Sequence, residues 1–563
     1  MTKQKLLLCD SEIEVKPLAS KRKIVFKPYS VAQDFLLPVR LISMIPNGHT
    51  CFLLSDIIDS MDITFIIDTY KGGGTSSYEP KMMLKCWILG FVDGIYSSRR
   101  LAKSIRENLV YVWISGNQRP DFRTLNDFRL RMKEEIKIIF KKVIIYGIEM
   151  RIIEGKDVFI DHSKKEANSN KHKIVWKKQV ERRLANIDKE LDELFSHIDE
   201  LNEKEDVDYK GKDLPENERK GFDKEKVKNI INRINQEMKE GKKPKEEGKS
   251  QKEKIKRALV LTQKKADYLE KKSKLGNRNS YSKTDNDAVA MLQKDKLSIK
   301  PSYNEGIVVE NGFVIDYIIS NNSNDAVSFI PLMEGAKENL GHAPESATAD
   351  AIFGTEENYS YIEKHKIGNF LKYPLFRKEQ SKKWRDEKLR FRDFIYNESG
   401  DSFSCKNGAT LKFVEEIKET TARGYAKILR NYRAEEGRCN GCPFREKCTT
   451  SRARTLQVSW EMERFKKVAR ENLSSEKGIE LRKRRGNEVE SVFGDSKLNK
   501  NHRRYILRGL KKVSLEAGLH YISHNIKKIK RFFDKKPNKD IYSYFFIPKK
   551  WTFWTSPLCL LFP

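Results

Sequence analysis

The sequence predicts a multidomain α+β protein in which a long helical segment interrupts a β-containing region. Apolar residues recur at helical spacing over residues 30–150, as at Trp87 and Phe91. Two β-type segments, within residues 157–161 and 306–319, lie on either side of a charged stretch that again has helical periodicity. Helices and strands that occupy separate parts of a chain are typical of α+β architectures.

The composition indicates a large, folding and strongly basic chain. Its 563 residues suffice for roughly three or four domains of ordinary size. Lys and Arg number 111 and Asp and Glu number 80, which gives a formal net charge of +31. Such a charge favours a polyanionic partner, because neutralising phosphates releases counterions. Nucleic acid is therefore the expected partner, and a merely soluble lysine-rich protein is the alternative.

Signals for membrane insertion and secretion are missing from the sequence pattern. No run reaches the roughly 20 apolar residues of a membrane span, and the apolar stretch at 6–9 is too short for a signal peptide. We therefore expect a cytoplasmic protein with no membrane partner. Eight cysteines in such a protein suggest thiols or metal ligands more than a disulfide framework.

A helical domain is expected over residues 30–150, after an N-terminal tail at 1–29. Pro80 favours the first turn of one helix, and Asp121 or Thr124 is a suitable N-cap for a later one. Arginines cluster in this domain, and three of them are candidate DNA contacts: Arg99, Arg100 and Arg123. A helical domain of this kind suits DNA binding, and a packing domain with a solvated basic face fits equally well.

Residues 177–280 carry a heptad pattern. Apolar residues alternate spacings of three and four from Val180 to Leu201. Further apolar periodicity marks helices over 227–238 and 255–269. We interpret this segment as a charged helical hairpin inserted into the β region, and a dimerising coiled coil fits the same pattern.

Three acidic positions are candidates for metal-dependent chemistry. Asp161 and Asp350 each follow a short β-type run, and Glu488 or Glu490 can supply a third carboxylate. Carboxylates are the side chains that hold Mg²⁺. Two such ions clamp the attacking and leaving oxygens of a phosphoryl transfer. The dipeptide Asn311-Gly312, between two apolar runs, predicts a β-hairpin in the same region.

Four cysteines suggest a separate structural metal site in a subregion at 400–455. Cys439, Cys442 and Cys448 follow a C-x2-C-x5-C spacing, and Cys405 lies upstream. Four thiolates can bind Zn²⁺ tetrahedrally. Reduced free thiols are the alternative.

Several segments resemble one family in matching order over residues 30–530. Tyr78 to Leu101 and Trp113 to Thr124 are similar to its amino-terminal helical domain. Phe159-Ile160-Asp161 with Lys165-Glu166-Ala167-Asn168, Ala349-Asp350-Ala351, and Glu490-Ser491-Val492-Phe493-Gly494 resemble its three catalytic motifs. The family is the DDE transposases of bacterial insertion sequences, in the group numbered eleven eighty-two. The chain departs from it at His162-Ser163, where Gly-Thr is usual, at Ile352 and at Arg482.

The resemblance implies a fold and a site. It implies a ribonuclease-H-like mixed-sheet catalytic domain at 151–176 and 281–535, interrupted by the helical insertion, with a C-terminal tail at 536–563. Asp161, Asp350 and Glu490 would be the ligands of Mg²⁺ or Mn²⁺, Glu490 being preferred because Lys497 follows seven positions later. Basic residues of the last motif would contact DNA phosphates: Arg485, Lys497, Arg504 and Arg508.

The resemblance also implies an activity. The protein would bind the terminal inverted repeats of its insertion sequence, cut the DNA by metal-dependent hydrolysis and join the 3′-hydroxyl ends to target DNA. It would act on double-stranded DNA as a homodimer or higher oligomer at the nucleoid. Two alternatives remain from the sequence: a nuclease of the same fold that does not rejoin DNA, and a catalytically inactive DNA-binding protein derived from a transposase.

Overall fold

The computed structural model describes residues 25–30, 40–74, 76–206, 231–232, 234–236, 238–241, 245–293, 295 and 297–535. The chain divides into two compact units, Met1–Tyr146 with Leu519–Pro563, and Gly147–Gly518. The expected C-terminal tail and most of the expected N-terminal tail lie outside the described residues. Among the helices that the structure describes, none is long and apolar enough to cross a membrane.

The regular elements that the structure describes in the first unit are helices, and α3 and α6 begin where the sequence predicts. Pro80 occupies the first turn of α3, and the Glu79 carboxylate accepts a hydrogen bond from the Met82 amide at 2.5 Å. Asp121 caps α6 by accepting two backbone amide hydrogens. The elements in chain order are η1 (Leu41–Met44), α1 (Thr50–Ser60), α2 (Thr64–Ile67), α3 (Pro80–Val92), α4 (Ser98–Glu107), α5 (Leu109–Ile114), α6 (Phe122–Arg131) and α7 (Ile136–Glu149), the last reaching into the second unit.

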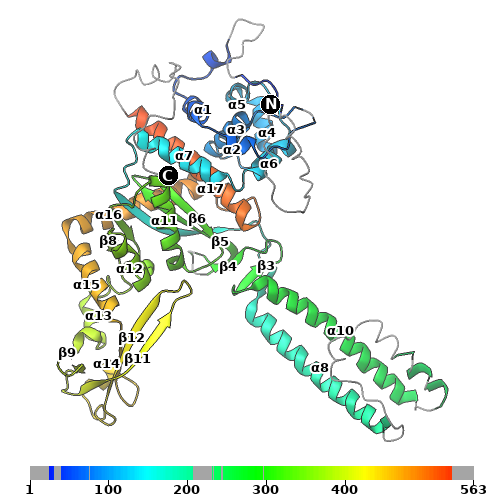
Figure 1. Ribbon diagram of the computed structural model, residues 1–563, viewed down its shortest axis with the longest axis vertical. Helices are drawn as coiled ribbons and strands as arrows, with labels where there is room; N and C mark the ends of the chain where they lie inside the picture. Colours follow the sequence, from blue (N-terminus) through cyan, green and yellow to red (C-terminus); the bar gives the residue numbers. More distant parts are fainter. Residues whose placement is uncertain are drawn as a thin grey trace, which may run out of the picture. The chain divides into compact units, whose positions relative to one another are not determined.

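A mixed sheet forms the centre of the second unit (Figure 1). Its order is β4-β5-β1-β7-β8, and β6 pairs with β5. β5 runs antiparallel to β1, whereas β7 is parallel to β1 and β8 is parallel to β7. The helix α16 packs against four of these strands, and α11 packs against β5 and β6. The bounds are β1 (Asp157–Glu166), β4 (Val289–Leu292), β5 (Ile299–Glu310), β6 (Phe313–Ser320), α11 (Phe329–Leu340), β7 (Ser346–Ala349), β8 (Gly368–Leu371), α16 (Glu476–Gly494) and α17 (Leu510–Asp534), which the two units share.

The first strand is longer than the sequence predicts. The β-type run was expected to end at Asp161, but β1 continues to Glu166, so that expectation is wrong. The reason is the partner strand: β5 is 12 residues long and pairs with β1 as far as Glu166 opposite Ser302. A polar stretch thus becomes a strand because its neighbour satisfies its backbone groups. Asp161 lies in the middle of β1 instead of at its end.

The predicted hairpin is confirmed. Glu310 of β5 pairs with Phe313 of β6, and only Asn311 and Gly312 lie between them. Their φ angles are 52° and 76°. Two consecutive left-handed residues define the tight turn that Asn-Gly favours, because its twist matches the twist of the strands.

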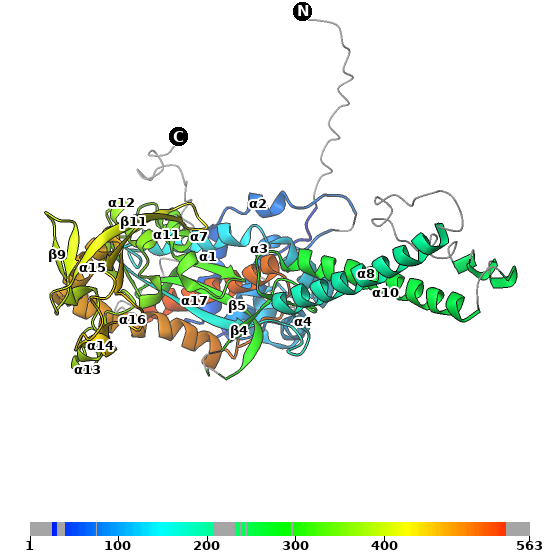
Figure 2. The same cartoon turned by 90° about the horizontal axis from the view of Figure 1, so that it is seen from below.

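The insertion is a pair of long helices packed along each other. Figures 1 and 2 show α8 (Lys177–Asp206) and α10 (Lys245–Leu275) side by side. α8 contacts β2 (Ile174–Trp176) and α10 contacts β3 (Ser280–Ser282), and these two strands pair as a small sheet. Ile187 and Leu191 of α8 form an apolar cluster with Ala258 and Leu261 of α10. The two helices pack against each other within one chain, as expected for a helical hairpin, which was one of the two interpretations of the sequence pattern. The predicted helix over 227–238 is described only at some of its residues.

The buried face of α10 does not include every apolar residue of the helix. Leu269, at the end of the helix predicted over 255–269, is 49% exposed. The buried residues that pack against α8 are Ala258 and Leu261. Ile255 of the same helix is buried as well and packs against Ile234.

An antiparallel five-stranded sheet forms the Cys-containing subregion. Its order is β13-β12-β11-β10-β9. A cluster around Phe403, Leu411 and Tyr432 fills its core, with Cys405, Cys439 and Cys448 packed against it. Further elements here are α12 (Glu356–Lys364), α13 (Lys382–Glu387), β9 (Ile395–Asn397), β10 (Ser402–Ser404), β11 (Thr410–Thr420), β12 (Ala426–Ala434), α14 (Arg445–Cys448), β13 (Thr455–Val458) and α15 (Trp460–Ser474).

Candidate active site

Two of the predicted carboxylates lie on neighbouring strands. Ile160 of β1 is paired in parallel register with Ala349 of β7. Each of these residues immediately precedes one of the aspartates, so Asp161 and Asp350 are adjacent across the sheet. Residues in the same register of parallel strands are about 4.8 Å apart. The sheet therefore brings together two acids that are 189 positions apart in the sequence.

A single guanidinium joins these two carboxylates. Arg485 of α16 approaches Asp161 Oδ1 at 3.2 Å with one terminal nitrogen and Asp350 Oδ1 at 3.1 Å with the other. Its side chain is only 12% exposed, while Asp161 and Asp350 are 25% and 49% exposed. The buried Nε of Arg485 has no hydrogen-bond partner among the described residues. Two carboxylates this close need a cation between them, and here the guanidinium supplies it.

A second cation lies beside Asp350. β8 pairs with β7 so that Leu371 is opposite Ala349. Lys372 comes directly after Leu371, just as Asp350 comes directly after Ala349, so the two residues are adjacent across the sheet. The Lys372 ammonium is 3.5 Å from Asp350 Oδ1. Burial lowers the pKa of Lys372, the Asp350 carboxylate raises it, and Arg485 lowers it further. The acidic pair is thus surrounded by positive charge.

The two candidate glutamates of α16 differ in their surroundings. Glu488 accepts a hydrogen bond from the Gly312 amide at 2.5 Å and lies 3.6 Å from Arg484. Glu490 is exposed, five positions after Arg485 and therefore about 140° around the helix from it. The structure thus places α16 beside the aspartates but does not bring Glu490 into contact with them. Its role as a third ligand stays a prediction.

The other basic residues of the last motif hold the chain that follows Asp161. The Lys497 ammonium donates to Ser163 Oγ at 2.5 Å and to the Lys164 carbonyl at 2.8 Å. Arg504 donates to the carbonyls of residues 167 and 169, and Arg508 donates to the carbonyl of residue 168. These hydrogen bonds connect the C-terminal part of β1 and the residues after it to the 497–508 segment. The predicted contacts of the same side chains with DNA stay predictions.

Two family comparisons bear on these observations. A family model described as a transposase DDE domain matches residues 404–530, and one described as a transposase domain matches residues 39–131. The chain is an insertion-sequence DDE transposase. No match is found among curated proteins or among solved structures. The first match includes Glu490 and Arg485 but neither aspartate, and the group numbered eleven eighty-two stays a prediction.

The family of the transposase generally uses a divalent metal ion. No group of three or more Cys, His, Asp or Glu side chains poised to hold a metal occurs in the described part of the chain. The Asp161–Asp350 pair nevertheless fits a cation, because the positions between its oxygens are filled by the Arg485 guanidinium. The carboxylate oxygens are the ligand atoms that Mg²⁺ prefers.

The transposase has His162 where a glycine is usual in the family that it resembles, and the structure explains how the larger side chain fits. His162 is buried, and its Nε2 lies 2.6 Å from the Ser328 hydroxyl. On the opposing strand, Gly306 passes so close to the imidazole that a Cβ would collide with it. Burial lowers the pKa of His162 to about 4. The larger side chain is thus accommodated by a glycine opposite it, and β1 keeps its register beside Asp161.

The four cysteines of the transposase share one neighbourhood. Burial raises the pKa of Cys448, Arg454 lowers it, and the thiols of Cys439, Cys405 and Cys442 raise it in turn. The Ala409 amide donates to the Cys405 sulfur at 3.3 Å. Amide donors to sulfur stabilise thiolates, which is the form that binds zinc. The four cysteines do not form a group poised to hold a metal ion in the described part of the chain, so the predicted zinc site stays a prediction.

Sequence reasoning missed the partners of the aspartates. Lys372 follows Asp350 by 22 positions and has no motif, so only the β7–β8 register reveals it. A buried network at the end of β1 was missed as well. Lys165 and Glu305 pair at 3.1 Å with both side chains fully buried, and His502 and Glu516 pair at 2.8 Å close by. A charged residue in a polar stretch carries no sign of such burial.

Proposed function

We propose that this transposase binds the ends of its insertion sequence, cuts the DNA there by metal-dependent hydrolysis and joins the 3′-hydroxyl ends to target DNA. One observation carries the proposal: Asp161 and Asp350 lie on adjacent parallel strands and share a cation. The strand order and directions support the ribonuclease-H-like fold. On one side of β1 lies β5, which is antiparallel to β1, followed by β6, which is antiparallel to β5. On the other side lie β7 and β8, which are parallel to β1.

In this proposal Asp161, Asp350 and Glu490 hold Mg²⁺ or Mn²⁺. A bound divalent ion supplies Lewis-acid stabilisation and a more acidic water. The structure favours Glu490 over Glu488 for one reason: the Glu488 carboxylate is already engaged by the Gly312 amide and Arg484. Glu490 has no such engagement among the described residues and must turn toward the aspartates, which requires a local change in α16.

The basic residues around the carboxylates position the DNA. Arg485 leaves the aspartates when a metal ion binds and turns its guanidinium to a phosphate, which it can contact with two parallel N–H groups. Lys497 fixes the chain next to Asp161 through the Ser163 hydroxyl. Positioning and charge stabilisation of this kind are the main protein contributions to phosphoryl transfer.

The helical first unit is proposed to hold the terminal repeats. Arg99 of α4 and Arg123 of α6 both lie over the ring of Phe122, at 4.9 and 5.7 Å from its centroid. The aromatic ring thus brings cationic groups from two helices together, and Arg100 next to them is exposed. Double-stranded DNA is the proposed partner, with a homodimer or higher oligomer on it. The four cysteines are proposed to hold one structural Zn²⁺.

A strand-transfer assay tests the proposal. Purified protein, Mg²⁺ and a labelled duplex carrying the terminal repeat should yield joined products with a second duplex. A nuclease of the same fold would give cut ends without joined products. An inactive DNA-binding protein would shift the duplex in a gel and cut nothing.

A further inference from the structure

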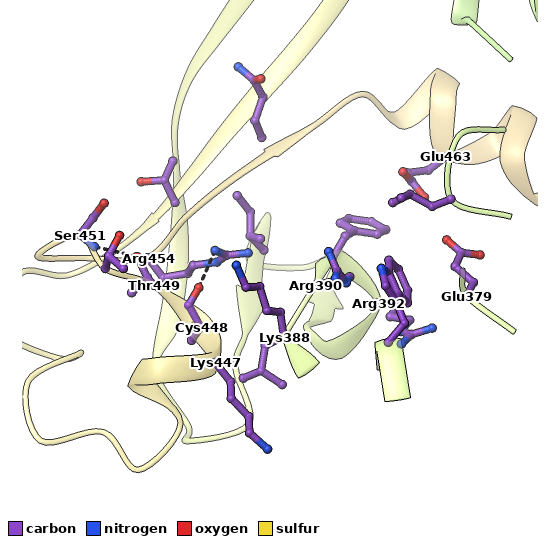
Figure 3. A pocket seen from close by; sticks show the side chains of 18 of the residues that line it. Glu379, Lys388, Arg390, Arg392, Lys447, Cys448, Thr449, Ser451, Arg454 and Glu463 are labelled. Atoms are coloured by element: carbon purple, nitrogen blue, oxygen red, sulfur yellow. Dashed lines mark hydrogen bonds between the residues drawn. The ribbon is translucent and has the colours of Figure 1, made fainter. Parts of the chain in front are cut away.

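A basic pocket lies between the Cys-containing sheet and the helices that flank it. Its volume is about 620 Å³, which is within the range of about 300–1,000 Å³ common for ligand sites. Its walls come from α13, the 388–392 segment, residues 446–457 and α15 (Figure 3). None of the aspartates or glutamates proposed as metal ligands lines it.

The pocket has a surplus of uncompensated positive charge. Seven cationic and three acidic side chains line it. Two cations are compensated: Lys466 pairs with Glu463 at 2.7 Å, and Arg470 lies 3.4 Å from Glu379. The other five have no carboxylate partner in the part of the chain that the structure describes: Lys388, Arg390, Arg392, Lys447 and Arg454.

Aromatic rings and backbone carbonyls hold two of these arginines in place. Arg390 lies over the ring of Trp384 at 3.8 Å from the centroid. Arg454 lies over Phe394 and donates to the Cys448 carbonyl at 2.7 Å, as the dashed line in Figure 3 shows. The Nε atoms of both arginines are buried and have no hydrogen-bond partner among the described residues. A guanidinium stacked on a ring keeps terminal N–H groups for an anion such as phosphate, which it can contact through two of its oxygens.

We propose that this pocket binds phosphates of the DNA backbone, as a second DNA contact apart from the carboxylate pair. The proposal rests on the proposed function in that it takes DNA as the partner. Phosphates suit the pocket for two reasons. Two of its arginines are held in place while Lys388 and Lys447 are exposed, and the cationic side chains that line it outnumber the acidic ones, which favours a polyanion. The contact reads no sequence, since it is made to backbone phosphates. The backbone carbonyl of Cys448 holds the Arg454 guanidinium at the wall of the pocket.

The test is a salt titration of DNA affinity with full-length protein. A fluorescein-labelled duplex of arbitrary sequence is titrated with wild type and with the double variant Lys388→Ala/Arg392→Ala, both by anisotropy. The two replaced side chains are at the exposed rim, so the fold is retained. Two lost phosphate contacts should lower the slope of log K against log salt by about 1.8, at about 0.9 per phosphate. Lys418→Ala, exposed on β11 outside the pocket, is the control and should keep the slope within one contact of wild type.

A second readout locates the contact. Trp384→Phe should remove part of the tryptophan fluorescence change that DNA causes, whereas Trp176→Phe on β2 should not. An unchanged salt slope in the double variant would overturn the proposal. So would a loss of binding to polyglutamate without a loss of binding to DNA, because the pocket would then serve an acidic protein. Strand transfer measured in parallel separates the pocket proposal from the proposed function. If the salt slope depends on the pocket but the protein cuts no DNA, the pocket proposal is supported and the proposed function is refuted.

Discussion

Replacing Arg485 should make the protein bind divalent metal more tightly. In the structure Arg485 contacts Asp161 and Asp350 at 3.2 and 3.1 Å, and its guanidinium lies between the oxygens that are proposed to hold the metal ion. Arg485→Gln removes that competing cation. Metal binding no longer has to break two charge-assisted contacts, so affinity should rise even though catalysis falls.

The size of the effect follows from burial. A charge-assisted hydrogen bond contributes about 1.5–3 kcal/mol. The contact to Asp350, which is 49% exposed, is screened and counts as a surface pair of about 0–1 kcal/mol. The contact to Asp161, which is 25% exposed, keeps more of its value. A net release of about 1.4 kcal/mol corresponds to an affinity about 10-fold higher.

Isothermal titration with Mn²⁺ in the absence of DNA measures this directly. Arg484→Gln is the control, because Arg484 pairs with Asp157, which is not a proposed ligand. Its Mn²⁺ affinity should equal that of wild type. A Mn²⁺ affinity of Arg485→Gln that is equal to or lower than wild type would refute the reasoning, since Arg485 would then not compete with the metal.

Three further predictions concern the glutamates, the zinc and the pH. Glu490→Gln should abolish cutting and joining with DNA binding retained, whereas Glu488→Gln should lower the melting temperature and spare activity; the reverse pattern would shift the third ligand by two residues. Purified protein should contain about one zinc per chain by elemental analysis, and Cys448→Ser should lose it; equal zinc content in both would refute a four-cysteine site. Burial lowers the pKa of His502 from 6.5. Burial alone would raise the pKa of Glu516, but the hydrogen bonds from His502 and from two backbone amides bring that pKa below its usual value. Both groups bind more protons when unfolded, so the melting temperature should fall as pH drops below about 6.5, and a flat profile there would contradict the buried pair.

The sequence predicts local starts and turns well, because these depend on few residues. Pro80 and Asp121 begin helices through their own side chains and backbone, and Asn311-Gly312 forms its turn through its own φ angles. The family motifs point to both aspartates, and the sheet brings them together. The helix starts, the turn and each motif are encoded within a short segment, whereas the meeting of the two aspartates is not.

What the sequence does not predict depends on partners far along the chain. β1 extends past Asp161 only because β5 lies beside it, and Lys372 reaches Asp350 only because β8 pairs with β7. Arg485 was expected at DNA and is found on the aspartates, since its partners come from two distant strands. Which apolar residues of α10 are buried depends on the helix beside it, since Leu261 packs against α8 whereas Leu269 is exposed.

The central claim is that Asp161 and Asp350 hold the metal that cuts and joins DNA, and one comparison tests it most directly. Mn²⁺ binding and strand transfer are measured on wild type, Asp161→Asn, Asp350→Asn and the control Asp157→Asn, whose carboxylate lies on the same strand but pairs with Lys477 and Arg484. Both site variants should lose Mn²⁺ binding and joined products while still binding DNA, and Asp157→Asn should keep both activities. Joined products from Asp161→Asn or Asp350→Asn at the wild-type level would contradict the account.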